Sequence, residues 1–524
     1  MHARVAALFL LVAACGPETT ATDLCEAAAE HRAECLGDYV TPPTCDAATE
    51  AQAQTILEMD CDEIAALARD GKADGAWCDW IGAGCTPDEA IFQGPRCTRD
   101  SDCVSGAACV EKHCFAGVDS AEFSTIMDTW TASRESSGST THLLDGNDET
   151  RQLRNRMMRE AQHSIHVTAL ILQPDATGYE TADLLVAAAR RGVEVRVVVD
   201  ATTQYTFGDY DILERLSTAG VEVIPFNPIL EWATVRGAIG INANQRLHEK
   251  LLIVDGKQAI VGGRNVGDDY LLDGQWRDTC VHLAGPGVAD VQRMFFSIWT
   301  QISGWERRAG CPQQRKFGFA CPAAGDPVVN DPRYTPATTA TTAARTRPVY
   351  SDPRSQRTPF GYRATLNLVR GARDTIFIAN SYFVPPRRLR KHLKAAVARG
   401  VRVVVVTNSL ESTDAWWMYY ASLNYYKELI GAGVEVYHYR GTETMHAKTM
   451  LVDGEVALVG SFNLDPRSAA SNSEAMLLVR DGAAVAELAR AFTTDLAYAD
   501  LADDDLTAAE WLKAKSFRLV EPLL

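Results

Sequence analysis

The sequence HEKLLIVDGKQAIVGGRN (248–265) has a second version in the same chain, HAKTMLVDGEVALVGSFN (446–463). Both fit one pattern, H-x-K-x4-D-x6-G-[GS]-x-N. Side chains alternate between the two faces of a β-strand, so a histidine and a lysine two residues apart project to the same side. Apolar runs around an Asp-Gly pair predict a hairpin that returns the final asparagine to this histidine and lysine. One copy would be weak evidence for a site, but two copies with matched offsets indicate a repeated functional unit.

The segments around the two motifs repeat as well. In each half, amphipathic helices end at a glycine and lead into buried strands, at residues 182–200 and 213–228 and again at 389–406 and 425–439. Alternating helices and strands predict an α/β fold with mostly parallel sheets. Any Rossmann-like unit could contain such helices, but no GxGxxG follows a first strand, so the dinucleotide-binding signature is missing.

Over roughly residues 125–520, the paired motifs resemble the HKD motifs of the phospholipase D superfamily. The resemblance implies two α/β/α halves that pack about a pseudo-twofold axis and share one site. We therefore expect a first half at 125–332, a linker or surface loop at 333–347 and a second half at 348–524.

For phosphodiester transfer, the resemblance implies that one of His248 and His446 attacks phosphorus and the other protonates the leaving alcohol. The spacing leaves open which histidine is the nucleophile. The side chains expected to hold the phosphate charge are Lys250, Lys448, Asn265, Asn463 and Ser461. No metal and no other cofactor is expected, because the two ammonium groups would supply the positive charge.

A nucleophilic histidine needs an acceptor on its other ring nitrogen. Asp278 and Glu474 are the candidates, since each precedes an apolar strand at a similar distance after a motif, where the family has a histidine-orienting acid. Asp255 and Asp453 fall at the two Asp-Gly turns, and we expect them to be structural.

The flanking sequences GGRNVGDDYL, NSYFVPPRRL and TNSLESTD resemble the bacterial cardiolipin synthases, and the last resembles the branch without N-terminal transmembrane helices. This implies phosphatidyl transfer to a phosphatidylglycerol-type hydroxyl through a phosphohistidine. Phospholipase D hydrolysis to phosphatidate, a superfamily nuclease and a non-catalytic envelope-binding lipoprotein remain alternatives. Gly263-Arg264 replaces the usual Ser-x of the first motif and removes a hydroxyl donor.

The N-terminus predicts export and lipidation. Residues 1–14 combine Arg4 with an apolar run of secretory-signal length, and the run leads to Cys15 in a sequence that resembles a lipobox. An ordinary cleaved signal peptide is the alternative. With residues 15–24 as a lipidated tether, we expect an exported bacterial lipoprotein at the periplasmic face of the outer membrane or the cell surface, with a phospholipid membrane as its partner.

Ten of the 14 cysteines lie in residues 25–118, which are predicted to form a small disulfide-rich module. Zinc binding is the alternative, but no CxxC pair supports it. Binding of an envelope component is a hypothesis for this module. Farther along the chain, Cys311 and Cys321 are expected to pair, and Cys280 is expected to be a buried free thiol.

The net charge of −17 is concentrated in residues 16–119, and the rest of the chain is near neutral. Neither part has the basic excess of a dedicated nucleic-acid binder, so no nucleic-acid partner is expected. The aromatic stretch DAWWMYYASLNYY (414–426) fits a membrane-interface helix and a core-facing helix about equally well.

Overall fold

The computed structural model describes residues 107–110, 113–131, 133–207, 210–227, 245–308, 319–322, 331–351, 360–503 and 505–518. The expected signal peptide, the lipidated Cys15, the tether and all but the end of the Cys-rich module lie outside these residues, as does Cys311. Cys321 is disulfide-bonded. Cys280 is a buried free thiol, as expected.

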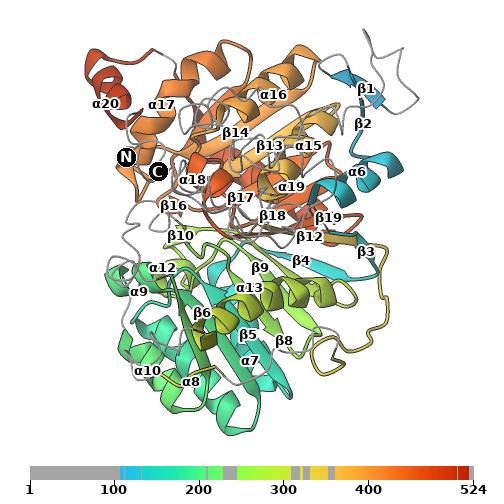
Figure 1. The fold of residues 1–524 in the computed structure, drawn as a ribbon. Helices are drawn as coiled ribbons and strands as arrows, with labels where there is room; N and C mark the ends of the chain where they lie inside the picture. Colours follow the sequence, from blue (N-terminus) through green and yellow to red (C-terminus); the bar gives the residue numbers. More distant parts are fainter. Residues whose placement is uncertain are drawn as a thin grey trace, which may run out of the picture. The chain divides into compact units, whose positions relative to one another are not determined.

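The first half is built on a seven-stranded sheet with the order β4-β11-β9-β8-β5-β6-β7 (Figure 1). Its strands are β4 (Thr140–Leu144), β5 (Ser164–Ala169), β6 (Glu194–Asp200), β7 (Glu222–Phe226), β8 (Leu251–Val254), β9 (Gln258–Gly262) and β11 (Cys280–Ala284). Its helices are α7 (Asn147–Glu160), α8 (Ala176–Arg190), α9 (Ala201–Phe207), α10 (Tyr210–Thr218), α12 (Asp268–Leu271) and α13 (Val288–Arg308). The glycines after α8 and α10, Gly192 and Gly220, have φ angles of 89° and 90°, which allow each helix to turn into the next strand.

The second half is built on a nine-stranded sheet with the order β20-β15-β14-β13-β17-β18-β19-β12-β3. Its strands are β3 (Ser136–Ser137), β12 (Arg345–Ser351), β13 (Thr375–Asn380), β14 (Arg402–Asn408), β15 (Glu435–Tyr439), β17 (Lys448–Val452), β18 (Val456–Gly460), β19 (Glu474–Arg480) and β20 (Ala499–Leu501). Its helices are α15 (Phe360–Gly371), α16 (Arg387–Ala398), α17 (Trp416–Ile430), α18 (Pro466–Ala470), α19 (Ala483–Ala497) and α20 (Ala508–Arg518). The central seven strands follow the same order as those of the first half, which confirms the predicted repeat.

The expectation of mostly parallel sheets was wrong. In the two large sheets, as far as the structure describes them, only β5, β6 and β7 and their counterparts β13, β14 and β15 pair in parallel, and all other neighbours are antiparallel. The crossover helices between these parallel strands are α8, α9 and α10 in the first half and α16 and α17 in the second. The motif strands β8–β9 and β17–β18 form hairpins instead, because an Asp-Gly turn joins them without a crossover helix.

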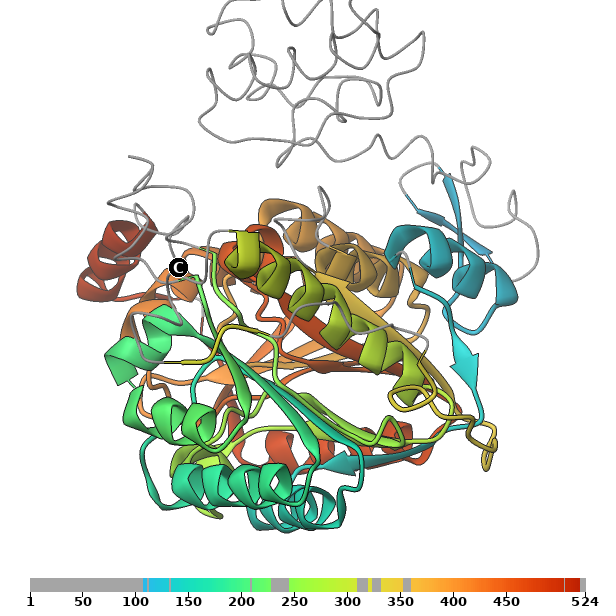
Figure 2. The same cartoon turned by 60° about the horizontal axis from the view of Figure 1, so that its bottom comes forward.

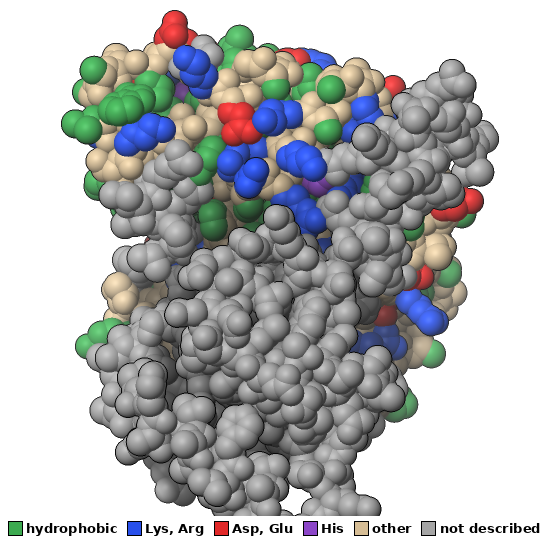
Figure 3. Space-filling model, turned by 45° about the horizontal axis from the view of Figure 1, so that its top comes forward, with side chains coloured by type: hydrophobic (Ala, Val, Ile, Leu, Met, Phe, Trp, Pro, Cys, Tyr) green, Lys and Arg blue, Asp and Glu red, His purple; other side chains and the backbone are tan. Residues whose placement is uncertain are grey.

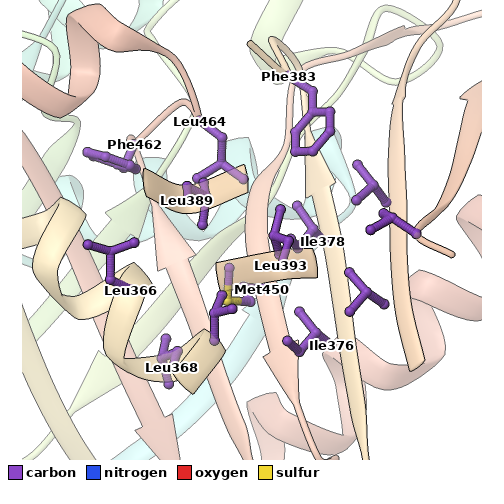
Figure 4. Close-up of a cluster of buried hydrophobic side chains, with 14 of the residues drawn as sticks. Leu366, Leu368, Ile376, Ile378, Phe383, Leu389, Leu393, Met450, Phe462 and Leu464 are labelled. Atoms are coloured by element: carbon purple, nitrogen blue, oxygen red, sulfur yellow. The ribbon is translucent and has the colours of Figure 1, made fainter. Parts of the chain in front are cut away.

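Three layers of apolar side chains hold the sheets and helices together. α7, α8, α10 and α12 cover the outer face of the first sheet, and α15 to α18 cover that of the second. Figure 4 shows part of the second layer, where Leu389 and Leu393 of α16 lie over Ile378 of β13. The inner faces of both sheets share one core, in which α13 contributes Phe295 and α19 contributes Phe492 (Figures 1 and 2).

The expected boundaries of the halves need correction. The helix α6 (Ala121–Thr131) precedes the first half in sequence, but its Phe123 and Met127 are buried in the outer core of the second half. The predicted linker at 333–347 overlaps β12. Arg347 in that strand is buried and donates to the Ser124 carbonyl at 3.0 Å, so the second half begins within the predicted linker. The hairpin of β1 (Ala107–Val110) and β2 (His113–Ala116), at the end of the expected Cys-rich module, also contacts α15.

The Asp-Gly turns fix the two motif hairpins to the strands beside them. Asp255 has a φ angle of 55°, and its carboxylate accepts the backbone N–H groups of Gln162, His163 and Ser164 at 2.7 to 3.2 Å. Asp453 has a φ angle of 53° and accepts three successive N–H groups of residues 373–375, each at 2.9 Å. Both aspartates point away from the histidines along the strand, which supports a structural role.

We expect Asp255→Ala to lower the free energy of unfolding by about 2 to 4 kcal/mol, because three backbone donors lose a charged acceptor and alanine tolerates positive φ poorly. Asp255→Asn keeps one oxygen acceptor and should lose less. Thermal unfolding monitored by circular dichroism measures both. Turnover per folded molecule should not change, and a variant that is fully stable but inactive would contradict the structural role.

Candidate active site

The two motif histidines lie where the halves join through backbone hydrogen bonds. In front of β8, the His248 N–H donates to the Ser473 carbonyl of the second half at 3.0 Å. In front of β17, the His446 N–H donates to the Arg277 carbonyl of the first half at 2.7 Å. There β10 (Trp276–Arg277) and β16 (Thr444–Met445) form a parallel pair between the halves. The histidines are therefore positioned by contacts that exist only when both halves are assembled.

Each histidine is paired with a carboxylate from the opposite half. His248 Nδ1 lies 3.0 Å from both carboxylate oxygens of Glu474, and His446 Nδ1 lies 2.6 Å from Asp278 Oδ2. Both carboxylates are completely buried. A carboxylate that accepts the Nδ1–H fixes the tautomer in which Nε2 carries the lone pair. The sequence singled out both acids, and the structure adds that the pairing is crossed, so neither half contains a complete histidine–acid pair.

Burial and neighbouring charges change the protonation of the histidines. Burial lowers the pKa of His248 to about 4, and the opposing effect of Glu474 only partly offsets it. Burial, together with the charge of Lys448, also lowers the pKa of His446. Both rings are therefore neutral near pH 7, which leaves a basic Nε2 available for attack or for proton transfer.

The two buried acids remain ionised. Burial alone would raise the pKa of Asp278, but His446 and Lys448 outweigh it and hold the pKa at about 2. For Glu474, burial is likewise outweighed by His248 and Lys250, so its pKa stays below the usual value. Each carboxylate thus stays an acceptor for its histidine throughout the neutral pH range.

The two lysines project beside the histidines, as the H-x-K spacing predicts. Lys250 Nζ donates to the His248 carbonyl and Lys448 Nζ to the His446 carbonyl, each at 2.5 Å. Burial lowers the pKa of Lys250 to about 7, helped by the charge of Lys448. Burial lowers the pKa of Lys448 to about 8, and Asp278 partly offsets the effect. Two ammonium groups this close repel each other, and an anion between them would relieve that repulsion.

The motif asparagines are oriented in the same way in both halves. Asn265 Oδ1 accepts the Leu170 N–H at 3.2 Å, and Asn463 Oδ1 accepts the Ser381 hydroxyl at 3.0 Å. Because each amide oxygen is held by the segment after β5 or β13, the amide nitrogen is the end left to donate. The Ser381 hydroxyl also accepts from Lys448 Nζ at 2.9 Å, so it orients two of the expected phosphate donors.

Ser461 differs from its expected position. We predicted that its hydroxyl would hold phosphate, but it is completely buried and donates to Glu474 Oε2 instead. The Ser468 hydroxyl donates to the other oxygen of this carboxylate at 2.7 Å. Ser461 therefore lies behind the acid that holds His248. A serine hydroxyl was correctly predicted to donate a hydrogen bond, but only the structure shows that the acceptor is the Glu474 carboxylate.

In the first half Gly263 stands at the position of this serine, because the carboxylate of Asp278 fills the space that a side chain would need. A Cβ atom on Gly263 would lie 2.3 Å from Asp278 Oδ1. The aspartate is one methylene shorter than Glu474, and its carboxylate lies against the glycine backbone. The adjacent Arg264 is buried and donates to the carbonyls of Leu144 and Asp278 at 2.7 and 2.5 Å. The departure from Ser-x thus accommodates the shorter acid of the first half.

Aromatic rings surround His446, and sequence reasoning missed them. The His446 ring lies 5.0 Å from Trp276, 5.4 Å from Tyr270 and 6.4 Å from Tyr382, measured between ring centroids. The Tyr382 hydroxyl donates to both oxygens of Asp414 at 2.8 and 2.9 Å. In the described residues no comparable set of rings lies near His248, so the two sides of the site differ chemically. The aromatic residues Trp276 and Tyr382 stand in the segments QWRD and NSYF, but nothing in either segment shows that its ring lies close to the motif histidine in space.

Restoring the serine of the first motif should damage the site. We expect Gly263→Ser to lower kcat/KM by about two orders of magnitude or more, because the new side chain displaces the carboxylate that orients His446. Ser461→Gly is the matched control, since it removes one donor to Glu474 without a clash and should cost about tenfold. A Gly263→Ser enzyme as active as the unsubstituted chain would contradict this account.

Activity should fall on the alkaline side. We expect kcat/KM to decline as pH rises through about 7 to 8, because Lys250 and Lys448 then lose the protons that attract a phosphate anion. Below that range both lysines are charged. In the pH profile of kcat the decline should occur at a higher pH than in that of kcat/KM, because bound phosphate favours the ammonium forms. Initial rates across about pH 5 to 10 test this, and a flat profile up to pH 9 would contradict it.

No group of three or more His, Cys, Asp or Glu side chains in the described ranges is placed to bind a metal ion.

Comparisons with known proteins agree with this geometry. Residues 155–299 and 365–496 match the family model described as cardiolipin synthase, PLD-like domain. The probable cardiolipin synthase YwiE of Bacillus subtilis (strain 168) is 32% identical over 358 residues, which cover 68% of this chain and 65% of that protein. Cardiolipin synthase 2 of Bacillus anthracis is 30% identical over 398 residues, 73% of this chain and 70% of that protein.

A solved structure supports the fold. The phosphatidylserine synthase of Haemophilus influenzae Rd KW20 superposes with a TM-score of 0.53 at 17% sequence identity, and the match covers 74% of this chain and 95% of that one. The sequence match to the first relative above spans just under two thirds of that relative's length, and both motifs fall within the ranges matched by the family model. The chain belongs to the PLD-like cardiolipin synthase family of the phospholipase D superfamily.

Proposed function

We propose that this protein is a phosphatidyltransferase that acts on phospholipids through a phosphohistidine intermediate, with cardiolipin synthase-like transfer as its reaction. The observation that carries the proposal is the crossed pairing of His248 with Glu474 and of His446 with Asp278. It supplies two oriented imidazoles in one site, and a double-displacement reaction at phosphorus requires one of them neutral, as the nucleophile, and the other protonated, as the acid.

In the first step, Nε2 of one histidine attacks phosphorus, and the bond between phosphorus and the leaving alcohol oxygen breaks. The other histidine takes up a proton on Nε2 when the anionic phosphodiester binds, because the negative charge beside it raises the pKa of the ring, and it gives that proton to the departing alkoxide. In the second step the same histidine, now neutral, takes the proton of the incoming hydroxyl, whose oxygen displaces the first histidine from phosphorus. The proton count closes over the cycle, and no other reactant is needed.

Lys250, Lys448, Asn265 and Asn463 would hold the non-bridging phosphate oxygens through both steps. These donors are fixed before substrate binds, since the asparagine oxygens and the lysine ammonium groups already have partners. Fixed donors in a buried site stabilise the charge that builds up on the phosphate without the cost of reorientation. Ser461 and the two acids act through the histidines and are positioning residues.

Transfer is favoured over hydrolysis by the family and by the rings around His446. A site wall of Tyr270, Trp276 and Tyr382 would disfavour bulk water, so an organic alcohol would compete better for the phosphohistidine. The relatives' names point to phospholipid substrates. A nuclease is disfavoured because the chain after residue 119 is near neutral rather than basic.

We further propose that the protein meets its substrate as an exported lipoprotein anchored through Cys15. The resemblance of residues 12–15 to a lipobox supports this location. None of the helices in the part of the chain that the structure describes is long and apolar enough to span a bilayer. Binding of an envelope component by the Cys-rich module remains a separate hypothesis.

Incubation of the purified protein with radiolabelled phosphatidylglycerol tests the reaction. We expect labelled cardiolipin and glycerol, and we expect His248→Ala and His446→Ala each to lower the rate by about a thousandfold or more. His142→Ala is the matched control, because this histidine lies on the surface between Glu149 and Glu487 and should not affect the rate.

The products separate the alternatives. Phosphatidate without cardiolipin would indicate phospholipase D hydrolysis at the same site. Full activity in either histidine variant would contradict the shared site, and no product from any phospholipid would contradict the proposed function as a whole.

A further inference from the structure

Large exposed apolar side chains in the described residues gather around one helix pair. Of eight such side chains, four lie on α17 and α20, which pack against each other, and a fifth lies just before α17. We call the following five residues the tryptophan patch, with their exposed fractions: Leu410 (40%), Trp416 (51%), Trp417 (39%), Trp511 (53%) and Leu512 (62%). Figure 3 shows apolar side chains mixed with Lys and Arg on the upper part of this half.

The exposed side chains of the patch are not needed to pack α17 against the protein core. The tyrosines of the same helix face inward, and Tyr420, Tyr425 and Tyr426 are 6%, 5% and 1% exposed. These buried tyrosines already supply the apolar face that the helix turns to the core. Trp416 lies one turn before Tyr420, with the two ring centroids 6.3 Å apart, yet Trp416 and Trp417 remain exposed at the start of the helix. Tryptophan is rarely left this exposed in a soluble protein, and a cluster of exposed large apolar side chains marks an interaction surface.

The patch lies beside the active site. Asp414 is two residues before Trp416, and its carboxylate accepts the hydroxyl of Tyr382, whose ring lies 6.4 Å from that of His446. The topology agrees, since α17 follows the carboxyl end of β14. His446 precedes β17, which runs antiparallel to β13, so it lies at the same edge of the sheet. A molecule that covers the patch would therefore lie on the same edge of the sheet as His446.

Lysines border the apolar surface. Lys515 Nζ lies 6.0 Å from the ring centre of Trp511, and Lys513 Nζ lies 4.7 Å from that of Tyr420 and donates to its hydroxyl at 3.0 Å. Lys513 is exposed. Tryptophan beside lysine is the composition that proteins present at the level of lipid headgroups, where the ring is partly apolar and the ammonium meets phosphate.

We propose that the tryptophan patch is a membrane-docking surface that inserts into the headgroup region of a phospholipid monolayer. Insertion here would place His446 and its aromatic wall at the height of lipid phosphates, so a substrate could enter without leaving the bilayer. The inference rests on the proposed function for its choice of occupant. It explains why the helix carries two outward tryptophans directly after the residue that holds Tyr382.

The test uses the full chain carrying Cys15→Ser, so that no acyl anchor contributes to binding. Sedimentation with vesicles of phosphatidylglycerol and phosphatidylcholine measures partition. We expect the double variant Trp416→Ser, Trp417→Ser to partition about tenfold more weakly, and Trp416→Phe, Trp417→Phe to retain most of the binding. We also expect Lys513→Ser and Lys515→Ser to weaken partition, and Lys257→Ser, at an exposed position in the β8–β9 turn of the first half, is the matched control.

Activity separates docking from chemistry. Turnover of a monomeric short-chain phosphatidylglycerol should be unchanged in the tryptophan variants, while kcat/KM on vesicles falls in step with partition. Equal vesicle binding by the serine variant and the unsubstituted chain overturns the proposal. So does a self-associated state that the substitutions dissociate without a change in vesicle binding. Patch-dependent vesicle binding by a chain that turns over no phospholipid would keep the docking surface and refute the proposed function instead.

Discussion

The hydrogen bonds that cross between the halves are the constraint on which the rest of the structure depends. Glu474 of the second half holds His248 of the first, and Asp278 of the first half holds His446 of the second. A separated half would carry a buried carboxylate without its histidine and a histidine without its acceptor. The common core between the inner faces of the sheets, with Phe295 and Phe492 in it, is what keeps these pairs together.

Burial of the ionisable groups changes their pKa values, on which the proposed chemistry depends, and it also lowers the stability of the fold. Six ionisable groups, namely two histidines, two lysines and two acids, are held in the interior, and the same burial that lowers the pKa of His248 also lowers that of Lys250. The two acids offset part of the free energy that burial of the positive charges requires. The depressed pKa of Asp278 means that its ionised form stabilises the fold above the ordinary aspartate pKa, and this stabilisation is lost as pH falls toward 2. A phosphate between the lysines would favour their ammonium forms.

The sequence predicted what repeats and missed what is unique to one half. Periodicity and the matched motifs predicted the α/β halves, the histidines and the lysines, because each of these appears twice at fixed offsets. The family resemblance pointed to the two acids, which lie at similar but unequal distances after their motifs. They could not give the crossed pairing, since it depends on contacts between residues more than 160 positions apart. The antiparallel pairing was missed because the apolar pattern of a buried strand does not show whether its neighbours run parallel or antiparallel to it.

Other errors also have physical causes. Ser461 was expected on the phosphate because a hydroxyl donates to any anion, and only the fold reveals that Glu474 is the nearer one. The wall of Tyr270 and Trp276 carries no fixed spacing to the motif. The placement of α6 against the second half was hidden because amphipathic periodicity shows that a helix is buried but not which sheet it covers.

The most direct test of the shared site is nitrogen-15 NMR of the histidine rings in the full chain labelled only at histidine. If the pairing is crossed, Glu474→Gln will shift the ring resonances of His248 and lower its pKa while leaving the Nδ1–H of His446 in place, and Asp278→Asn will do the reverse. If Glu474→Gln instead perturbs His446 and leaves His248 unchanged, each half holds its own histidine and the account is contradicted.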